Sequence, residues 1–362
     1  MAIWKIDELG EFVTLKRGYD LPQQKRKNGE IPIFSSSGVT GTHNEAMVEA
    51  PGVITGRYGT IGEVFFAETS FWPLNTTLYV ENFHENDEKF VYYFLKTLEW
   101  KKFASASAVP GINRNTVHKE IVRFPDFETQ QKIASVLSTI DKKIAVNKAI
   151  NDNLEQQAAA LFSSLYNRSN TEVRYTDLIQ ILGGGTPKTG ETAYWNGNIA
   201  FFTPKDVGTP YTFITEKTIT EEGLSHCNSR LYPVNTVFVT ARGTVGKVGL
   251  SGIPMAMNQS CYALVGKETH QLLVYFYTLK AVDSLKHKAS GAVFDAITTR
   301  DFDSEQIMKL SDDDAKAFLC VAEPMFQEML NNSIENLRLS TLRDFLLPKL
   351  MSGEIDVSSV QL

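Results

Sequence analysis

The stretch that decides the fold is residues 128–167, ETQQKIASVLSTIDKKIAVNKAINDNLEQQAAALFSSLYN. Apolar or small residues recur along it in steps of three and four, which places them on one narrow stripe of a helix. The members of the stripe are Ile133, Leu137, Ile140, Ile144, Leu154, Ala158, Leu161 and Leu165. About 38 helical residues would extend over roughly 57 Å, which is far longer than the usual globular helix. We therefore predict a long spacer helix.

Asn147 and Asn151 fall in the register of this stripe, at the place where its apolar residues are missing. Asparagine at such a position weakens a pair of helices but fixes their alignment and their partner. We therefore expect the helix to pair with another helix.

Residues 314–347 carry a comparable stripe near the carboxyl end. Its members are Phe326, Leu330, Ile334, Leu337, Thr341 and Phe345. Asp312 and Asp313 are expected to cap this second helix. Pro324 should kink or split it, and Pro348 should end it, because the residue before a proline leaves the helical region.

Two long helices with similar stripes in one chain most simply pack antiparallel against each other. The residues expected at their interface are Ile133, Leu137, Ile140, Ile144, Asn147, Leu154, Leu330, Ile334 and Leu337.

The segments on either side of the first helix are two versions of one module. Residues 53–64, VITGRYGTIGEV, match residues 237–248, VFVTARGTVGKV, at an offset of 184. Residues 91–94, VYYF, match residues 274–277, VYFY, at an offset of 183. Each module alternates short β-like runs with loops rich in Gly, Ser and Asn, and a helix follows.

We predict an α+β fold with pseudo-twofold symmetry, in which two repeated α/β domains are separated by two long antiparallel helices that form a coiled coil. At 362 residues the chain is too long for one compact core, which agrees with two domains. The expected segments are residues 1–125 for the first domain, 126–170 for the first spacer helix, 171–311 for the second domain, and 312–362 for the second spacer helix and a C-terminal tail.

Composition indicates an ordinary globular protein, with 43% hydrophobic and 22% charged residues. Its three cysteines have no CxxC spacing and suggest neither a disulfide framework nor a zinc site. The amino terminus lacks the apolar run of a signal peptide, and no apolar stretch is long enough to span a membrane. We expect a cytoplasmic protein with no membrane partner.

The net charge of −6 argues mildly against a nucleic-acid partner, but a basic surface can be local. One segment, residues 16–27, is strongly basic. It contains Lys16, Arg17, Lys25, Arg26 and Lys27 against the single acid Asp20.

No sequence motif indicates catalysis. The histidines are scattered, and residues 183–189, GGGTPKT, lack the GxxxxGK[ST] spacing of a phosphate loop. A DNA methyltransferase would need a cofactor loop and an Asn/Asp-Pro-Pro-aromatic motif, and a nuclease would need clustered carboxylates with a lysine. We expect no cofactor or metal on this chain, so any chemistry would belong to a partner.

The candidate DNA-binding residues lie mainly in two glycine-rich turns and two short loops. Residues 56–62, GRYGTIG, and 242–249, RGTVGKVG, place glycine at every third position beside Arg57 and Arg242. Tight turns need such glycines whatever the function, yet they also let backbone approach a phosphate while arginine reaches a phosphate or a guanine edge. Both interpretations remain open.

The loops at residues 35–38, SSSG, and 203–206, TPKD, follow matching β-like runs. Their side chains suit hydrogen bonding to bases and phosphates, although they are also ordinary turn residues. The candidate DNA contacts are Lys16, Arg17, Ser35, Ser36, Arg57, Tyr58, Thr60, Lys188, Thr203, Lys205, Arg242, Thr244 and Lys247.

In order and content, nearly the whole chain resembles the specificity subunits of type I restriction-modification systems. The similar pieces are the two glycine-rich hairpins and residues 130–133 (QQKI), 184–189 (GGTPKT), 194–198 (YWNGN), 202–207 (FTPKDV) and 346–354 (LLPKLMSGE). The resemblance implies a non-catalytic targeting subunit with two target-recognition domains, each of which reads one half of a gapped double-stranded DNA target.

The same resemblance implies that the helices dock two methyltransferase subunits and that restriction-translocase subunits complete the complex. S-adenosylmethionine, ATP and magnesium would then be bound by those partners. Two other functions remain possible: a protein-interaction scaffold that dimerises through its helices, and a self-sufficient modification enzyme. Salt-dependent DNA binding would argue against the scaffold, and methyl transfer by the chain alone would favour the enzyme.

Overall fold

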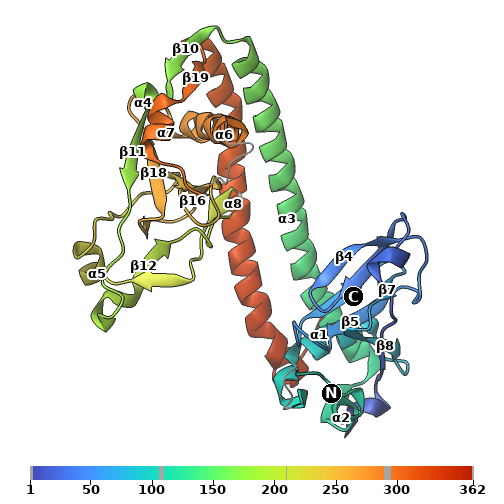
Figure 1. Ribbon diagram of the computed structural model, residues 1–362. Coiled ribbons are helices and arrows are strands. Elements are labelled where there is room, and N and C mark those ends of the chain that lie inside the picture. Colours follow the sequence, from blue (N-terminus) through green and yellow to red (C-terminus); the bar gives the residue numbers. More distant parts are fainter. Residues whose placement is uncertain (1–2, 106–109, 209, 289–294, 361–362) are drawn as a thin grey trace. The chain divides into compact units, whose positions relative to one another are not determined.

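The structure is a computed structural model that describes residues 3–105, 110–208, 210–288 and 295–360. Its contacts divide the chain into unit 1, Met1–Val146 with Asn336–Leu362, and unit 2, Asn147–Glu335. Two long helices, α3 (Phe127–Arg168) and α8 (Asp312–Met351), each contribute to both units (Figure 1). The predicted two-domain α/β organisation and the long helix are confirmed.

Unit 1 is built on a four-stranded antiparallel sheet in the order β2-β8-β5-β6. The sheets β4-β3-β7 and β1-β9 accompany it. Its elements are β1 (Trp4–Glu8), β2 (Thr14–Arg17), β3 (Ile31–Ser35), β4 (Gly38–His43), β5 (Gly52–Gly56), β6 (Val64–Ala67), β7 (Trp72–Pro73), β8 (Thr77–Asn82), α1 (Glu88–Thr97), α2 (Arg114–His118) and β9 (Ile121–Pro125).

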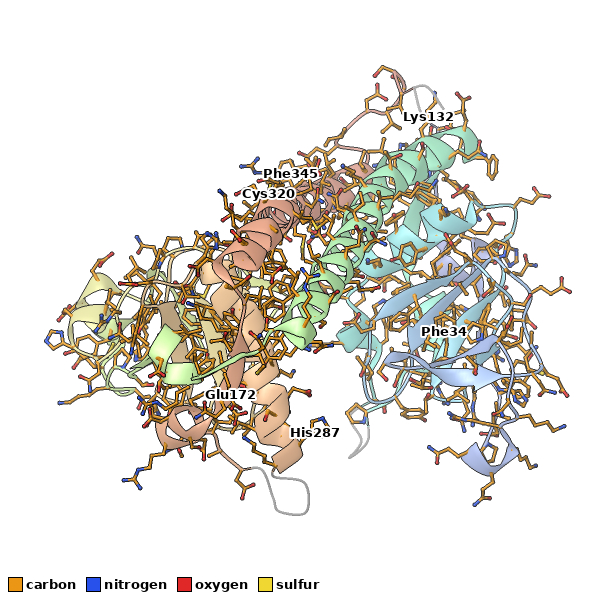
Figure 2. The ribbon with its side chains drawn as sticks, turned by 90° about the horizontal axis from the view of Figure 1, so that it is seen from above. Phe34, Lys132, Glu172, His287, Cys320 and Phe345 are labelled. Carbon is orange, nitrogen blue, oxygen red and sulfur yellow. The ribbon has the colours of Figure 1, made fainter. Side chains whose placement is uncertain are left out.

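The core of unit 1 lies under α1, where the rings of Phe90 and Phe94 pack against Phe124 with centroids 5.2 and 4.5 Å apart. A second cluster joins the two larger sheets. In it Phe34 of β3, labelled in Figure 2, packs with Ile54 of β5 and Tyr79 of β8.

Unit 2 is built on a five-stranded sheet in the order β11-β18-β15-β16-β13, accompanied by the sheets β14-β12-β17 and β10-β19. Its elements besides the long helices are β10 (Thr171–Arg174), α4 (Tyr175–Leu178), β11 (Ile179–Gly183), β12 (Trp195–Phe202), β13 (Tyr211–Thr212), β14 (Lys217–Ile219), α5 (Glu221–Ser225), β15 (Val237–Thr240), β16 (Val248–Ser251), β17 (Met255–Met257), β18 (Cys261–Gly266), α6 (Gln271–Lys288), α7 (Thr299–Ser304) and β19 (Gln306–Lys309).

The strand order of unit 1 recurs in unit 2. The sheet β2-β8-β5-β6 corresponds to β11-β18-β15-β16, and β4-β3-β7 corresponds to β14-β12-β17. The registers agree as well: Arg17 lies opposite Leu78, and Gly183 lies opposite Tyr262. Unit 2 adds β13 at the edge of its larger sheet. Each unit therefore carries one copy of the repeated fold.

The apolar stripe of α3 is buried in both units. In unit 1, Ile133 and Leu137 belong to a core cluster that also contains Leu350 and Met351 of α8. Ile140 and Ile144 are buried as well. Of the other residues expected at the helix interface, Leu330 belongs to the core cluster of unit 2, Leu154 and Ile334 pack against that cluster, and Leu337 is half-buried.

Within unit 2 the asparagines of the stripe bond to α8. The Asn147 side-chain amide donates to Glu335 Oε2 at 2.6 Å. The Asn151 amide donates to the Met329 carbonyl and to Ser333 Oγ, both at 3.2 Å. Because a buried polar side chain needs its partners, these bonds favour one alignment of the two helix segments.

α8 is uninterrupted through Pro324 and Pro348, so the expected split at Pro324 and the expected end at Pro348 are both wrong. A proline in a helix interior costs about 3 kcal/mol, because it removes one hydrogen bond and crowds the preceding turn. Around Pro324 the helix buries Phe318 and Phe326 in the core of unit 2, and this burial offsets the cost. The helix ends only before Gly353, whose φ of 74° suits a glycine cap.

The start of α8 also differs from the expectation. Ser311 Oγ accepts a hydrogen bond from the backbone N–H of Asp314 at 3.1 Å, so Ser311 is the cap in place of Asp312 or Asp313. No helix formed by the residues described above is both long and apolar enough to cross a membrane. All three cysteines are free.

The start of α3 is capped by Asp126, and replacing this residue by alanine is expected to destabilise unit 1. Its Oδ1 accepts from the backbone N–H and the hydroxyl of Thr129 at 3.0 and 2.9 Å, and its Oδ2 accepts from the Ile3 N–H. Loss of such a cap costs about 0.5–2 kcal/mol of unfolding free energy, which urea denaturation at neutral pH would measure.

The cap should also make stability depend on pH. The backbone hydrogen bond from Thr129 holds the pKa of Asp126 below its usual value. A carboxylate with a lowered folded pKa contributes stability above its unfolded pKa, about 3.9, and loses it as the pH falls through the folded value. The difference in unfolding free energy between the wild type and Asp126→Ala should therefore become smaller in acid. Asp152→Ala, at an exposed position within α3, is the control. An equal loss of unfolding free energy in both variants would contradict the assignment of Asp126 as the cap of α3.

Candidate nucleic-acid interface

The turn between β5 and β6 holds Arg57 in a defined position. Its Nε donates to the Ile112 carbonyl at 3.1 Å, and its guanidinium lies 4.5 Å from the centroid of the Tyr58 ring. Gly59 and Gly62 have φ of 75° and 91°, so the turn needs glycine for its conformation alone. The interpretation of these glycines as residues that a tight turn requires is confirmed. The contacts of Arg57 with Ile112 and Tyr58 also fix its side chain at the surface.

Gly111 makes room for this arrangement. A Cβ added there would lie 2.1 Å from Cε1 of Tyr58, which no real contact allows. The Tyr58 ring, and the Arg57 guanidinium that lies over it, therefore require glycine at position 111.

The serine loop lies beside the same turn. Ser35 Oγ accepts from the Ser37 N–H and donates to the Gly38 carbonyl, both at 3.2 Å, which closes the connection between β3 and β4. A Cβ built on Gly59 would lie 3.4 Å from Ser36 Oγ. The structure thus brings Ser36 and the glycine turn, with its exposed Thr60, to one place.

Lys16 and Arg17 also lie close to Arg57. All three line one pocket of about 530 Å³ together with Tyr58 and Arg114, the first residue of α2. A hydrogen bond from Lys16 to Glu81 at 2.5 Å raises the pKa of Lys16, so this side chain is charged at neutral pH. Arg114 was not expected from the sequence, where it is a single arginine in the polar run Asn113-Arg114-Asn115.

The histidine on α2 does not add to this charge. Burial, followed by the charge of Arg114, lowers the pKa of His118, so its ring is neutral at pH 7. The neutral ring accepts the Leu15 N–H through Nε2 at 2.8 Å. His118 therefore holds the backbone of β2 through this hydrogen bond, and the arginines and Lys16 are the cations that line the pocket.

Unit 2 repeats the turn between β15 and β16. Gly243 and Gly246 have φ of 80° and 73°. The Thr240 hydroxyl, on the last residue of β15, accepts from the Lys247 N–H at 2.9 Å and donates to the Thr244 carbonyl. This closes the turn and leaves the side chains of Arg242, Thr244 and Lys247 exposed.

The loop after β12 lies beside the second turn, as the serine loop lies beside the first. A Cβ on Gly243 would lie 3.8 Å from Cβ of Pro204. In this loop the Thr203 hydroxyl donates to Asp206 Oδ2 at 2.6 Å, and Lys205 Nζ lies 3.4 Å from Glu216. Both side chains expected to reach DNA thus already have a partner.

Lys188 is not brought to the turn by any described contact. It is exposed, and its backbone carbonyl accepts from Trp195 Nε1 at 3.2 Å.

The two arginines beside the turns are not equivalent, which agrees with the offset of 184 between the two sequences. The N–H groups of Arg57 and Tyr58 both donate to one carbonyl, that of Thr76, and the N–H groups of Ala241 and Arg242 both donate to that of Ser260. Ala241 therefore occupies the place of Arg57, and Arg242 occupies the place of Tyr58. The hydrogen bond from the Ile297 N–H to the Ala241 carbonyl, at 2.9 Å, matches that from Ile112 to Arg57, at 3.1 Å.

The family model, the related sequences and the solved structure that match this chain all belong to type I restriction-modification specificity subunits. A family model described as the type I restriction modification DNA specificity domain matches residues 1–156 and 167–309. The type I restriction enzyme HindI specificity subunit of Haemophilus influenzae is 25% identical over 345 residues, which are 72% of this chain and 75% of that protein.

The type I restriction enzyme MjaIX specificity subunit of Methanocaldococcus jannaschii is 32% identical over 124 residues, 33% of this chain and 29% of that protein. Among solved structures, the S subunit of a type I restriction-modification system from M. genitalium superimposes with a TM-score of 0.65 at 17% identity. It covers 96% of both chains, so the two share a fold.

Proposed function

Because the chain belongs to the family of the type I restriction-modification DNA specificity domain, we propose that it reads a two-part DNA target, one part with each repeated domain. Its role is that of the DNA-recognition subunit of such a system. The observation that carries the two-part target is the repeat itself. In both units one strand order places a glycine turn beside a polar loop.

The proposed reading domains are residues 1–125 and 171–311. In the first, the DNA contacts are Lys16, Arg17, Ser35, Ser36, Arg57, Tyr58 and Thr60; in the second they are Lys188, Thr203, Lys205, Arg242, Thr244 and Lys247. Arginine and lysine suit phosphates and guanine edges, and hydroxyl groups suit bases and phosphates. Exposure of Arg242, Thr244 and Lys247 on a glycine turn supports their part in this proposal.

The spacer segments, residues 126–170 and 312–362, are proposed to form an antiparallel coiled coil that separates the domains with approximate twofold symmetry. Support comes from the bonds of Asn147 and Asn151 to α8 within unit 2. Two readers on one face of B-DNA would lie about 34 Å apart, one helical turn. A longer spacer would then lengthen the gap in the target.

The chain is proposed to be non-catalytic and cytoplasmic. Its helices would dock two methyltransferase subunits, and restriction-translocase subunits would complete the assembly. S-adenosylmethionine, ATP and magnesium would be bound by those partners. This division of labour follows from the family and from a sequence that carries no motif for methyl transfer or nucleotide binding.

Methylome sequencing of a cell that expresses the chain with its methyltransferase and restriction partners tests the proposal. We expect methylation at a gapped, asymmetric motif that disappears when the gene for this chain is removed. A continuous motif would contradict reading by two domains. Methyl transfer by the purified chain without partners would contradict a non-catalytic role.

A further inference from the structure

We infer that the pocket of unit 1 lined by Lys16, Arg17, Arg57 and Arg114 binds one phosphate group of the DNA backbone. We also infer that the second domain lacks the corresponding site. The inference rests on the proposed function, because it takes the half-site read by the first domain as the ligand. It makes the two domains unequal: they share a fold, but only the first would hold its DNA by this phosphate.

The four cations of the pocket are only partly neutralised. Lys16 pairs with Glu81 at 2.5 Å, while Arg17 and Asp20 lie 3.9 Å apart with both side chains more than half exposed. Arg57 and Arg114 form no ion pair with the described carboxylates. An anion in the pocket would therefore meet a net positive charge from two arginines that no acid offsets.

The arginines of the pocket are also held in place by groups that carry no charge. The carbonyl of Ile112 accepts from Arg57 Nε, and the Tyr58 ring supports its guanidinium. The carbonyl of Leu15 accepts from Arg114 Nη1 at 3.5 Å. A positively charged group that is fixed before binding loses little conformational freedom when it meets a phosphate. Arginine also presents several donors to the oxygens of one phosphate.

The place of the pocket in the fold favours a phosphate of DNA over a free anion. Arg57 and Tyr58 belong to the glycine turn that stands beside Ser36. A DNA strand that lies on this turn would have its backbone next to the pocket. Phosphate contacts of this kind position a duplex without reading its sequence.

None of the four cations has a charged counterpart in the second domain. Because the Thr76 carbonyl corresponds to that of Ser260, the register of the sheets puts Leu182 at the place of Lys16 and Gly183 at that of Arg17. The turn puts Ala241 at the place of Arg57. Ile112 and Ile297 are equivalent, and two residues after each of them Arg114 corresponds to Thr299. Leucine, glycine, alanine and threonine at these positions supply no charge.

The test compares Arg114→Gln with the wild type, each assembled with the methyltransferase partner, by fluorescence anisotropy on duplexes with and without the target. We expect Arg114→Gln to weaken both complexes by a similar factor and to reduce the salt slope by about 1. Between 50 and 200 mM salt, the wild type should then lose about 3.5-fold more affinity than the variant. Arg300→Gln, an exposed arginine of α7 in the second domain, is the matched control and should keep the wild-type slope.

Single uncharged methylphosphonate linkages, placed in turn across both half-sites, identify the phosphate. One position in the first half-site should weaken the wild type but not weaken Arg114→Gln further. If no position removes the difference between the two proteins, the phosphate site is refuted. A variant that relaxes recognition at one base pair with an unchanged salt slope would also refute it, because this pattern indicates a base contact. Circular dichroism confirms that the variant folds, and the gapped motif in the methylome tests the proposed function separately.

Discussion

Replacing Phe162 by alanine is expected to lower the unfolding free energy of unit 2 by about 3–5 kcal/mol, the largest effect of any single substitution considered for this chain. Phe162 lies on α3 and is 1% exposed. Its ring centroid is 5.0 Å from that of Phe276 on α6, 5.4 Å from Phe318 on α8 and 5.5 Å from Tyr277. Alanine would leave a cavity where three helices meet. Urea denaturation followed by circular dichroism measures the loss.

Phe345→Ala provides the matched control for this prediction. Phe345, labelled in Figure 2, is also a phenylalanine of a long helix, but it is 59% exposed. Its replacement should change the unfolding free energy by no more than about 0.5 kcal/mol. If Phe162→Ala cost as little as Phe345→Ala, the aromatic cluster would not be the core that joins α3 to α6 and α8.

Local periodicity was enough to predict α3. Its apolar residues repeat at helical spacing, and the polar pair Asn147 and Asn151 marked the only interruption of the stripe. The repeat was also visible in the sequence, because the glycine turns need the same residue type at the same positive φ in both units. Features that depend on neighbours along the chain could thus be read directly.

Features that depend on residues distant in the sequence could not be predicted from it. Pro324 carries a local preference against helix, and only the burial of Phe318 and Phe326 against the rest of unit 2 overrides it. Arg114 reaches the pocket because the residues beside it pair with the glycine turn at Tyr58.

Exchanging the first reading domain for that of another specificity subunit is expected to change one half of the methylated motif and leave the other half and the gap unchanged. If each domain reads its half-site independently, only contacts to the first half are replaced. Binding to the original target should fall by roughly 10³-fold or more, toward the level of non-specific DNA. Methylome sequencing of cells that carry the chimera gives both halves of the motif and the gap in one measurement.

The structure of unit 1 shows which contacts with the long helices an exchanged first domain must preserve. The Tyr93 hydroxyl donates to Asp141 Oδ2 at 2.6 Å, and Arg343 of α8 donates to Asp141 Oδ1 at 2.8 Å, so one carboxylate joins α1 to both long helices. The Gln130 side chain, at the start of α3, likewise accepts from the Asp87 N–H at 2.9 Å. The incoming domain must therefore keep tyrosine at position 93 and a residue other than proline at position 87, while α3 and α8 stay unchanged.

The reciprocal chimera, in which residues 171–311 are replaced, is the matched control, because it should change only the other half of the motif. A chimera with Tyr93→Phe separates the two roles of the first domain. It keeps every DNA contact but loses the bond to Asp141, so it should retain the new half-site and lose stability. If a sound exchange of the first domain altered both halves of the motif, the two domains would not read DNA independently, and the repeated fold would have to serve a joint recognition surface instead.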